Sequence, residues 1–285
     1  MRYWSESHRR ISPGLAAMAD RRTRVDGEMF DVMLRRRRRE EHSDPRSIAF
    51  LSALGIPPEG RCLEVGAGLG SLARWMAACL APGGFVQATE VRPELVHTIS
   101  EGAPSNLEII RHDIVTDPPP GQDYDLIHAR FVLEHLPSRD RVLRSLASML
   151  SPGGWLVIED ALITKAILDG PAPFLAAMRS FTRRRATMGS DYTWARNLPG
   201  QFRQLRLGNI RVQRVADIFE SGSELGAFWA AVLQQESGPA YAAHGAGSPA
   251  CEVAALLCAG SEWFSGPHII QCAGQREPGA TEWSR

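Results

Sequence analysis

Three glycines at alternate positions, directly after a short apolar run, form the stretch of this sequence whose spacing most clearly suggests chemistry. The apolar run contains one acid, Glu64, and is followed by Gly66, Gly68 and Gly70. Glycine tolerates positive φ angles and lets a ligand approach the main chain closely. The periodic segment 71–80 predicts a helix whose first N–H groups have no partner within the helix and can face a ligand. We therefore predict a strand, a glycine turn and a helix that together bind a nucleotide-like cofactor.

The spacing of the glycines narrows the choice of ligand. A dinucleotide fingerprint needs G-x-G-x-x-G, and Ser71 stands where its third glycine would be. The sequence has no Gly-Lys-Ser or Gly-Lys-Thr, which excludes a P-loop. Glu64 would repel a pyrophosphate but suits a ligand with a cationic end. Two alternatives remain at this point: a turn that only packs a helix on a strand, and, more distantly, an NAD-dependent oxidoreductase.

Acidic residues end the next two predicted strands. The strand 85–90 ends at Glu90, where a carboxylate can accept hydrogen bonds from both hydroxyls of a ribose. The alternative is a carboxylate that merely starts the following helix, where acids are favoured. The strand 106–113 ends at Asp113, which is followed by the apolar Ile114, and Asp113 could also simply cap the turn.

Two more predicted strands lead into residues that could move protons. The strand 124–130 is followed by a segment containing His135, and histidine titrates near neutrality, so it can act as a general base. A structural histidine that fixes the loop is the alternative. His128 lies within the strand and is expected to be packed or paired. The strand 155–160 ends at Asp160, on the side where doubly wound sheets bind ligands, so Asp160 is a candidate for substrate contact, proton acceptance or capping.

Together these segments resemble the motifs of the class I S-adenosylmethionine-dependent methyltransferases. The pattern E-x-G-x-G-x-G at 64–70 resembles their first motif, and Glu90 fits the second. The stretches YDLIHARFVLEHLP (124–137) and LSPGGWLVIED (150–160) are similar to the small-molecule branch, such as the ubiquinone/menaquinone C-methyltransferase type. The resemblance covers residues 61–160. It implies an α/β fold, a doubly wound seven-stranded Rossmann-like sheet in which strands six and seven form a hairpin, with S-adenosylmethionine as cofactor and S-adenosylhomocysteine as product.

The resemblance also implies contacts to the cofactor. Glu90 would bind the ribose, Asp113 the adenine amino group, and Ile114 the face of the adenine ring, while Ala129 and Arg130 would surround the methionine part. The cofactor-binding residues expected from the motifs are Glu64, Gly66, Ala67, Gly68, Gly70, Glu90, Val91, Asp113, Ile114, Ala129 and Arg130.

Segments on both sides of this core are expected to complete the fold. We predict an N-terminal helical cap (1–45), a cofactor-binding core (46–165), a helical substrate-recognition insertion between strands five and six (166–207), and a C-terminal part of the core (208–285). In the cap, Tyr3, Trp4 and Met18 could pack on substrate or cofactor or simply anchor helices. Asp44-Pro45 is expected to start a second helix. The five arginines at 35–39 are interpreted as a solvated helix face rather than a nucleic-acid contact.

The region between strands five and six could supply an apolar pocket. A helix is predicted over 173–188, and core packing would explain each of its large side chains singly. Their clustering in the family's substrate-recognition region favours the pocket equally. The candidates for substrate contact are Phe174, Met178, Phe181, Tyr192 and Trp194. Strands at 209–216 and 268–274, separated by helices at 224–235 and 250–264, are predicted to follow.

Composition limits the class of protein. The chain has 285 residues, 44% hydrophobic and 22% charged, with a net charge of zero, which argues against disorder and against bulk attraction to nucleic acid. No apolar run approaches the roughly 18–20 residues that span a bilayer, and the first residues resemble no signal peptide. The five cysteines are scattered and lack C-x-x-C, which suggests free thiols in a reducing compartment rather than a zinc site. We expect a cytoplasmic protein that binds no metal, and a homodimer is one candidate for its oligomeric state.

The expected function is methyl transfer from S-adenosylmethionine to a small organic acceptor, for which natural-product metabolism is one candidate setting. Two alternatives stay open. The same fold and cofactor could catalyse a cyclisation, decarboxylation or hydroxylation, or the chain could be a non-catalytic binding subunit. The acceptor and the methylated element (oxygen, nitrogen or carbon) are not specified by these motifs.

Overall fold

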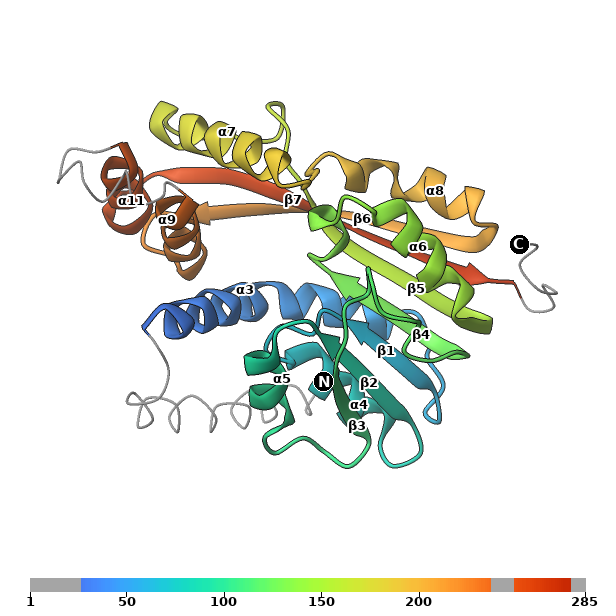
Figure 1. Ribbon diagram of the computed structural model, residues 1–285. Helices are drawn as coiled ribbons and strands as arrows, with labels where there is room; N and C mark the ends of the chain where they lie inside the picture. Colours follow the sequence, from blue (N-terminus) through green and yellow to red (C-terminus); the bar gives the residue numbers. More distant parts are fainter. Residues whose placement is uncertain (1–26, 237–248, 278–285) are drawn as a thin grey trace.

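A seven-stranded sheet lies at the centre of the computed structural model, which describes residues 27–236 and 249–277 (Figure 1). Tyr3, Trp4 and Met18 lie outside the described residues. The strands are β1 (Arg61–Val65), β2 (Phe85–Glu90), β3 (Leu107–Arg111), β4 (Tyr124–Arg130), β5 (Leu150–Leu162), β6 (Leu207–Glu220) and β7 (Trp263–Arg276).

The sheet has the strand order β3-β2-β1-β4-β5-β7-β6. Strands β1 to β5 pair in parallel, whereas β7 runs antiparallel to both β5 and β6. The chain moves outward from β1 to β3 and then returns to β4, so the order reverses between β1 and β4. Ligands of doubly wound sheets bind at the carboxyl ends of the strands beside such a reversal. The predicted doubly wound α/β sheet, including the hairpin of strands six and seven, is confirmed.

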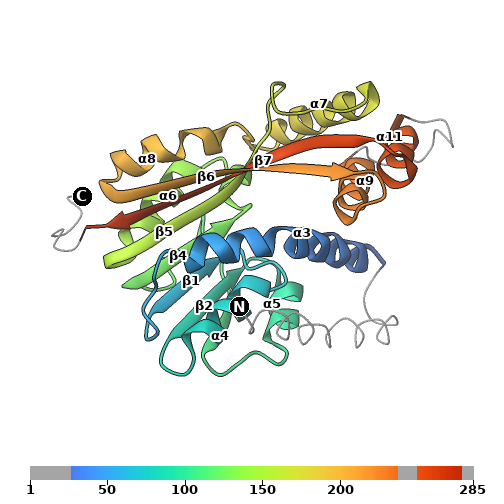
Figure 2. The same cartoon turned by 180° about the vertical axis from the view of Figure 1, so that it is seen from behind.

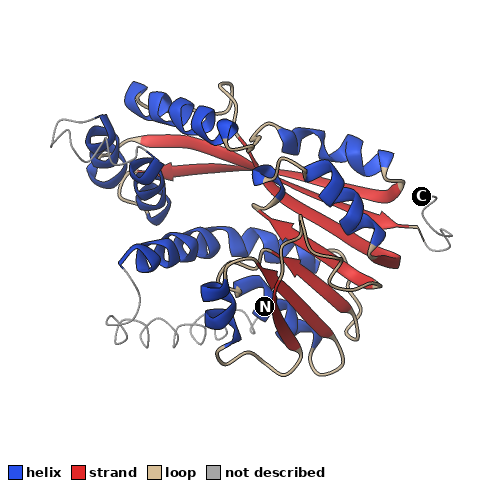
Figure 3. Cartoon of the chain, in the orientation of Figure 1, coloured by secondary structure: helices blue, strands red, loops and turns tan. Residues whose placement is uncertain are grey.

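Helices cover both faces of this sheet (Figures 2 and 3). The helices are α3 (Gly27–Ser52), α4 (Ser71–Leu80), α5 (Pro93–Ser100), η1 (Leu133–His135), α6 (Arg139–Ser148), α7 (Ala172–Thr187), η2 (Trp194–Asn197), α8 (Leu198–Gln204), α9 (Glu224–Glu236) and α11 (Pro249–Ala259). Helices α3, α4 and α5 bury apolar side chains against one face, and α6, η2 and α8 against the other. The two faces are therefore shielded from water, as parallel sheets require.

The hairpin of β6 and β7 is longer than the rest of the sheet and supports a separate helical layer. Both strands have 14 residues, against five to seven for β1 to β4. Their far ends carry α7, α9 and α11, as Figure 1 shows. A third hydrophobic core joins these helices, built around Phe174, Trp229, Leu257 and Phe264. The predicted helical insertion between strands five and six is present as α7, η2 and α8.

Helix α3 corrects one prediction. Asp44-Pro45 was expected to begin a new helix, but α3 continues through it with Pro45 inside. The Asp44 carboxylate does not cap a helix; its Oδ1 accepts a hydrogen bond from Arg130 Nη2 at 2.7 Å. A proline removes only one helical hydrogen bond, and tertiary contacts on both sides of it hold the helix together. The predicted boundary at residue 45 thus falls within one helix.

The last predicted helix is also too long. Helix α11 ends at Ala259, and β7 begins at Trp263 rather than at residue 268. Residues 263–265 instead pair with the end of β6, where Phe264 lies opposite Phe219 and the centres of their stacked rings are 5.3 Å apart. This pairing with a distant strand overrides the local helical pattern.

Candidate functional site

The glycine turn has the backbone geometry that the sequence predicts. Gly66, Gly68 and Gly70 have φ angles of 69°, 65° and 84°. A Cβ atom on Gly68 would lie 2.6 Å from Glu40 Oε1 of α3, so the carboxylate rests directly on this glycine. Glycine is therefore required both by the backbone angle and by the close approach of another group.

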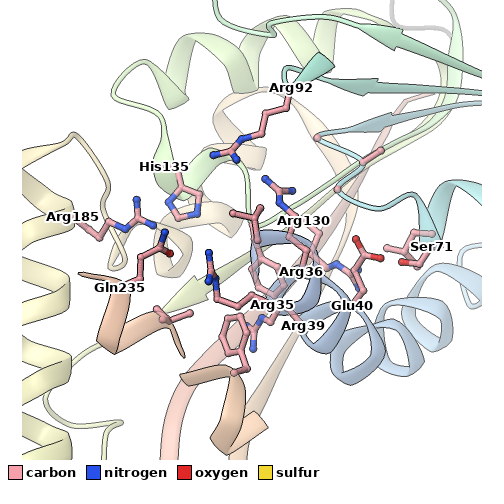
Figure 4. A pocket seen from close by; sticks show the side chains of 18 of the residues that line it. Arg35, Arg36, Arg39, Glu40, Ser71, Arg92, Arg130, His135, Arg185 and Gln235 are labelled. Atoms are coloured by element: carbon pink, nitrogen blue, oxygen red, sulfur yellow. The ribbon is translucent and has the colours of Figure 1, made fainter. Parts of the chain in front are cut away.

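A cavity of about 580 Å³ opens on this turn (Figure 4). Its size is typical of small-molecule sites. One end is bounded by the turn, by the start of α4 and by Glu40 of α3, and Figure 4 shows Glu40 and Ser71 together on that side. The other end is bounded by His135, by the end of α7 and by α9, with Arg185 and Gln235 on that side of the view. We call the first end the turn end and the second the far chamber.

Glu90 lies beside the turn, at the carboxyl end of β2. Its side chain is 4% exposed. One oxygen accepts a hydrogen bond from the N–H of Gly68 (3.2 Å), and the other accepts from the N–H groups of Val91 (3.0 Å) and Arg92 (3.2 Å). Arg36 Nη1 of α3 lies 3.7 Å from the same carboxylate. The carboxylate predicted to bind a ribose is thus held in a fixed position against the glycine turn.

Glu64 belongs to a buried charge network beneath the turn. His128 of β4 places Nδ1 2.7 Å from Glu64 Oε2 and Nε2 3.1 Å from Glu159 Oε1 of β5. Burial opposes the charge of His128, but the two carboxylates outweigh it and raise its pKa from 6.5 to about 9. His128 is therefore an imidazolium at neutral pH, with both ring nitrogens donating. The prediction that His128 is paired is confirmed.

The same network fastens α3 to the sheet. Glu159 accepts hydrogen bonds from the Ser47 hydroxyl (2.7 Å) and from Gln271 Nε2 of β7 (3.0 Å). Arg130 donates to the Ser47 hydroxyl (2.9 Å) and to Asp44 (2.7 Å). The predicted cofactor residue Arg130 is therefore positioned by α3 while it also lines the cavity.

A second prediction is wrong in part: the arginines at 35–39 were interpreted as a solvated helix face, but some of them face the cavity. Arg35, Arg36 and Arg39 line the cavity. Arg39 Nη1 contacts the buried Asp217 of β6 at 2.8 Å, and its guanidinium lies 4.2 Å from the centre of the Phe131 ring. These three arginines are spaced i, i+1 and i+4, which places them on one side of a helix. Because residues 35–39 are all arginine, they are spread around the whole helix, and the sequence alone does not indicate which of them line the cavity.

Glu40, on the same face of α3, covers the turn. Its Oε1 accepts a hydrogen bond from the N–H of Leu69 at 2.6 Å. Burial raises the pKa of Glu40 from 4.5 to about 7, although the bond from Leu69 acts in the opposite direction. A ligand that packs on Gly68 therefore has to displace this carboxylate.

His135 reaches the cavity, as a candidate base must. It lies in η1 and lines the far chamber. Its Nδ1 is 3.4 Å from the Ser190 hydroxyl, its Nε2 is 3.4 Å from Glu134, and its ring meets the edge of the Tyr192 ring. Burial and the nearby Arg185 lower its pKa to about 4, so the imidazole is neutral at pH 7.

Asp160 does not reach the cavity. It is fully buried, and its two oxygens accept hydrogen bonds from the N–H groups of Val132 (3.2 Å) and Glu134 (2.9 Å). The Glu134 carboxylate accepts a hydrogen bond from the N–H of Ala161 in return. Burial and the Glu134 carboxylate raise the pKa of Asp160 well above its ordinary value. Its position supports the capping alternative and gives no support to a catalytic role.

The predicted substrate residues are placed in cores rather than in the cavity wall. Phe174, Met178 and Tyr192 pack in the third core between α7, α9 and β7, together with Phe181. Trp194 lies in the core on the face of the sheet covered by α6. The aromatic cluster thus holds the helical layer to the β6–β7 hairpin. This part of the chain reaches the cavity through Arg184, Arg185 and Met188 instead.

The remaining predicted cofactor residues surround the turn end without lining the cavity. Val91 is exposed directly after β2, and Ala129 is a fully buried residue of β4 beside Val65. Asp113 and Ile114 follow β3, the neighbour of β2, and Asp113 Oδ1 accepts a hydrogen bond from the N–H of Val115. All four stand at the carboxyl edge of the sheet, two strands or fewer from the turn. Their roles stay predictions.

The sequence motifs do not point to several of the residues that line the cavity. They are Arg92 after β2, Arg184 and Arg185 of α7, Met188 after it, and Phe228 and Gln235 of α9. Only the β6–β7 hairpin brings α9 over the turn, and no local pattern reveals that approach. Within 27–236 and 249–277, no group of three His, Cys, Asp or Glu residues is arranged to hold a metal, and no helix is long and apolar enough to cross a membrane.

Comparison with known proteins agrees with this geometry. A family model described as a methyltransferase domain matches residues 33–205. Methyltransferase str3 of Strobilurus tenacellus is 34% identical over 57% of this chain and 57% of its own length. The ubiquinone/menaquinone biosynthesis C-methyltransferase UbiE of Ectopseudomonas mendocina is 26% identical over 36% of this chain and 43% of its own. The chain spans about half the length of the curated relatives it matches.

Solved structures show the same fold. The YcgJ protein from Bacillus subtilis is 15% identical, with a TM-score of 0.56. The match covers 81% of this chain and 97% of the YcgJ chain. The phosphoethanolamine N-methyltransferase 2 of Haemonchus contortus, solved with S-adenosyl-L-methionine, is 14% identical with a TM-score of 0.54; the match covers 82% of this chain and 52% of that one. At such identities the likeness concerns the fold alone.

The strand order, the glycine turn after β1 and the acid after β2 define a class I, Rossmann-like cofactor-binding domain. The family model covers more than half of the chain, so the chain belongs to the methyltransferase domain family. The family prediction made from residues 61–160 is thereby confirmed, and with it S-adenosylmethionine as the cofactor of the family.

Proposed function

We propose that this protein binds S-adenosylmethionine at the turn end of the cavity and transfers its methyl group to a small organic acceptor in the far chamber. One observation carries the proposal: a single cavity joins the glycine turn to the space beneath α7 and α9. A cofactor and an acceptor can therefore lie side by side without crossing bulk water. Membership of the methyltransferase domain family supports this assignment.

The residues at the turn end fit this cofactor. Gly66 and Gly68 leave the main chain open to close approach, and Glu90 presents a carboxylate that can accept from two ribose hydroxyls. Val91, Asp113 and Ile114 would hold the adenine. The main chain of Ala129, with Glu64 and Arg130, would hold the methionine part, whose ammonium and carboxylate groups match their charges. When bound, the cofactor supplies an electrophilic methyl group on a sulfonium centre.

The chain's own contribution is alignment and exclusion of water. Helix α3 on one side and the layer of α7 and α9 on the other line the cavity, and their side chains would orient a bound acceptor. His135 is the one predicted proton acceptor that reaches the far chamber among the described residues. With its pKa near 4 it accepts a hydrogen bond but is a weak base. A negative charge bound among the neighbouring arginines would raise that pKa and strengthen the base.

Calorimetric titration with S-adenosylmethionine, S-adenosylhomocysteine and NAD, side by side, tests the cofactor. We expect the first two to bind and NAD to give no signal. Binding of NAD alone would overturn the proposal.

A matched pair of variants locates the site. Gly68 and Gly102 have similar positive φ angles, 65° and 62°, but a Cβ on Gly68 meets Glu40, whereas a Cβ on Gly102 meets nothing within 4 Å. Both Gly→Ala changes therefore strain the backbone alike, and only Gly68→Ala fills the turn end. Loss of cofactor binding in Gly68→Ala but not in Gly102→Ala is expected; equal affinities would show that the site lies elsewhere.

Product analysis separates methyl transfer from its alternatives. Incubation with S-adenosylmethionine and candidate acceptors is expected to give equal amounts of methylated product and S-adenosylhomocysteine. A converted substrate without S-adenosylhomocysteine would favour a cyclisation, decarboxylation or hydroxylation.

We further infer a cytoplasmic enzyme of natural-product biosynthesis. Cys62, Cys79, Cys258 and Cys272 are free thiols, which suits a reducing compartment. The homodimer stays a prediction, which sedimentation analysis of the purified chain tests directly.

A further inference from the structure

Two charged side chains of α3 lie directly on the glycine turn. Glu40 Oε1 accepts a hydrogen bond from the N–H of Leu69 at 2.6 Å, and Arg36 Nη1 lies 3.7 Å from Glu90 Oε2. A Cβ atom on Gly68 would lie 2.6 Å from Glu40 Oε1 and 3.6 Å from Arg36 Nη1. Both side chains also line the cavity (Figure 4). They therefore cover the glycine that would let a ligand approach the main chain.

Both side chains contact the end of the cavity that the proposed function assigns to the cofactor. Glu90 presents the carboxylate expected to bind the ribose, and its Oε2 accepts a hydrogen bond from the N–H of Gly68. A carboxylate oxygen has about two acceptor sites, so Oε2 can accept one more hydrogen bond. The Arg36 guanidinium lies at this oxygen, where a ribose hydroxyl would bind. The N–H of Leu69, which Glu40 engages, lies where the turn leads into α4.

Helix α3 is fastened to the sheet next to these residues, so it cannot easily move away as a whole. The buried Asp217 carboxylate of β6 lies 2.8 Å from Arg39, 3.0 Å from His42 and 2.7 Å from Arg46. Arg39 directly precedes Glu40 in the helix. Breaking contacts to a buried carboxylate costs more than rotating two side chains. Access to the turn therefore depends on rotation of the side chains that cover it.

Arg36 and Glu40 can pair with each other when they leave the turn. They are spaced i, i+4 on one helix, and opposite charges at that spacing are neighbours on the helix surface. The same helix already contains such a pair one residue further along, where Arg37 Nε lies 2.6 Å from Glu41 Oε1. Rotation away from the turn thus offers a new partner to both charged groups.

We propose that Arg36 and Glu40 act as a built-in competitor of the cofactor: they hold Glu90 and the Leu69 N–H in the closed arrangement, and they release both and pair with each other when the cofactor binds. This inference rests on the proposed function, because it concerns access to the same cofactor site. The closed arrangement reduces the fraction of molecules that can bind, and the apparent affinity falls by that fraction. Removing either side chain is therefore expected to tighten cofactor binding, whereas removing a residue that binds the cofactor would weaken it.

The test is calorimetric titration of the intact protein with S-adenosylhomocysteine at pH 8, where the Glu40 carboxyl group, with its pKa of about 7, is largely ionised. Glu40→Ala is expected to bind roughly tenfold more tightly than the wild type, the scale of a hydrogen bond to a charged group. Arg36→Gln is expected to gain roughly two- to fivefold, because its ion pair with Glu90 is longer and its side chain is 35% exposed. Glu40→Gln keeps an acceptor oxygen and is expected to lie between the wild type and Glu40→Ala.

The neighbouring pair on α3 provides matched controls. Arg37 and Glu41 have the same residue types and the same spacing as the proposed competitor, but they pair with each other on the outside of the helix. The Glu41 side chain is 56% exposed, and the cavity lining includes neither residue. Arg37→Gln and Glu41→Ala are therefore expected to leave the affinity for S-adenosylhomocysteine unchanged.

Two results would overturn the inference. Unchanged or weaker binding in both Glu40→Ala and Arg36→Gln would show that these side chains do not compete with the cofactor. An equal gain in the two control variants would show that any change on α3 loosens the site. If one cavity variant does not fold, the other decides. Failure of the proposed function is distinguishable, because S-adenosylhomocysteine would then bind neither to the wild type nor to any variant, and the inference would fall with it.

Discussion

Replacing His128 tests the charge network beneath the glycine turn. Its pKa of about 9, against 6.5 in the unfolded chain, corresponds to about 3 kcal/mol, because a tenfold change in proton affinity is worth about 1.4 kcal/mol. A raised pKa means that the folded state holds the proton more tightly. This stabilisation is therefore complete below about pH 6.5 and is lost as the pH rises through 9.

His128→Gln removes the cation and leaves the Glu64 and Glu159 carboxylates facing each other without it. Loss of one partner from a buried pair costs about 3–5 kcal/mol. We expect urea unfolding at about pH 6 to show a deficit of that size relative to the wild type. Between about pH 6 and pH 9.5 the deficit is expected to shrink by about 3 kcal/mol, because the wild type loses its own advantage.

A surface histidine provides the control. His97 lies on α5 with its side chain 80% exposed, so His97→Gln is expected to change the free energy of unfolding by less than about 0.5 kcal/mol at any pH. A deficit for His128→Gln that stays constant with pH would refute a charged His128. If His128→Gln does not fold, the wild type alone provides the test. Equal free energies of unfolding at pH 6 and pH 9.5 would then refute a charged His128.

Three further predictions concern the site and the core. Glu90→Ala is expected to weaken S-adenosylmethionine binding by about 1–3 kcal/mol, whereas Glu94→Ala on the exposed start of α5 leaves it unchanged. Burial raises the pKa of Glu40 to about 7, and displacement into water returns it toward 4.5 with release of a proton. Calorimetric affinity for S-adenosylhomocysteine is therefore expected to rise roughly tenfold from about pH 6 to pH 8, and not in Glu40→Gln. Phe174→Ala is expected to lower the free energy of unfolding, measured in urea, by about 3–5 kcal/mol without changing cofactor affinity.

Each of these has a contradicting result. If folded Glu90→Ala binds the cofactor with normal affinity, Glu90 does not bind the ribose. A pH dependence that persists in Glu40→Gln would assign the released proton to another group. If Phe174→Ala leaves the free energy of unfolding unchanged but weakens acceptor binding, Phe174 contacts the substrate and does not stabilise the core.

The parts of the fold that the sequence predicts well are those specified by local signals. Strands β2 and β4 and helix α4 begin and end where predicted. The glycine turn before α4 and the segment Pro82-Gly83-Gly84 between α4 and β2 are the local signals that mark these boundaries. The glycine turn is also predicted by a local signal, because alternate glycines directly after a strand have few other uses. Order and spacing of these segments are enough to identify the sheet.

The parts that escape prediction depend on contacts between distant residues. The arginines of α3 look solvated in sequence, because the partner of Arg39, Asp217, lies far along the chain on β6. The aromatic residues of α7 are compatible with a pocket or a core, and only the position of the β6–β7 hairpin decides for the core. For the same reason the sequence does not indicate that arginines of α3 and α7 line one cavity.

The position of β7 has a consequence for synthesis of the protein. This strand lies between β5 and β6 in the sheet but follows both in the chain. Because domains begin to fold from their N-terminal side during translation, β5 keeps an open edge, and β6 lacks its partner strand, until Trp263–Arg276 has been made. Open edges pair readily with other chains. A ribosome that stalls or stops before this strand therefore releases a chain in which β5 and β6 both lack their partner strand and can pair with other chains.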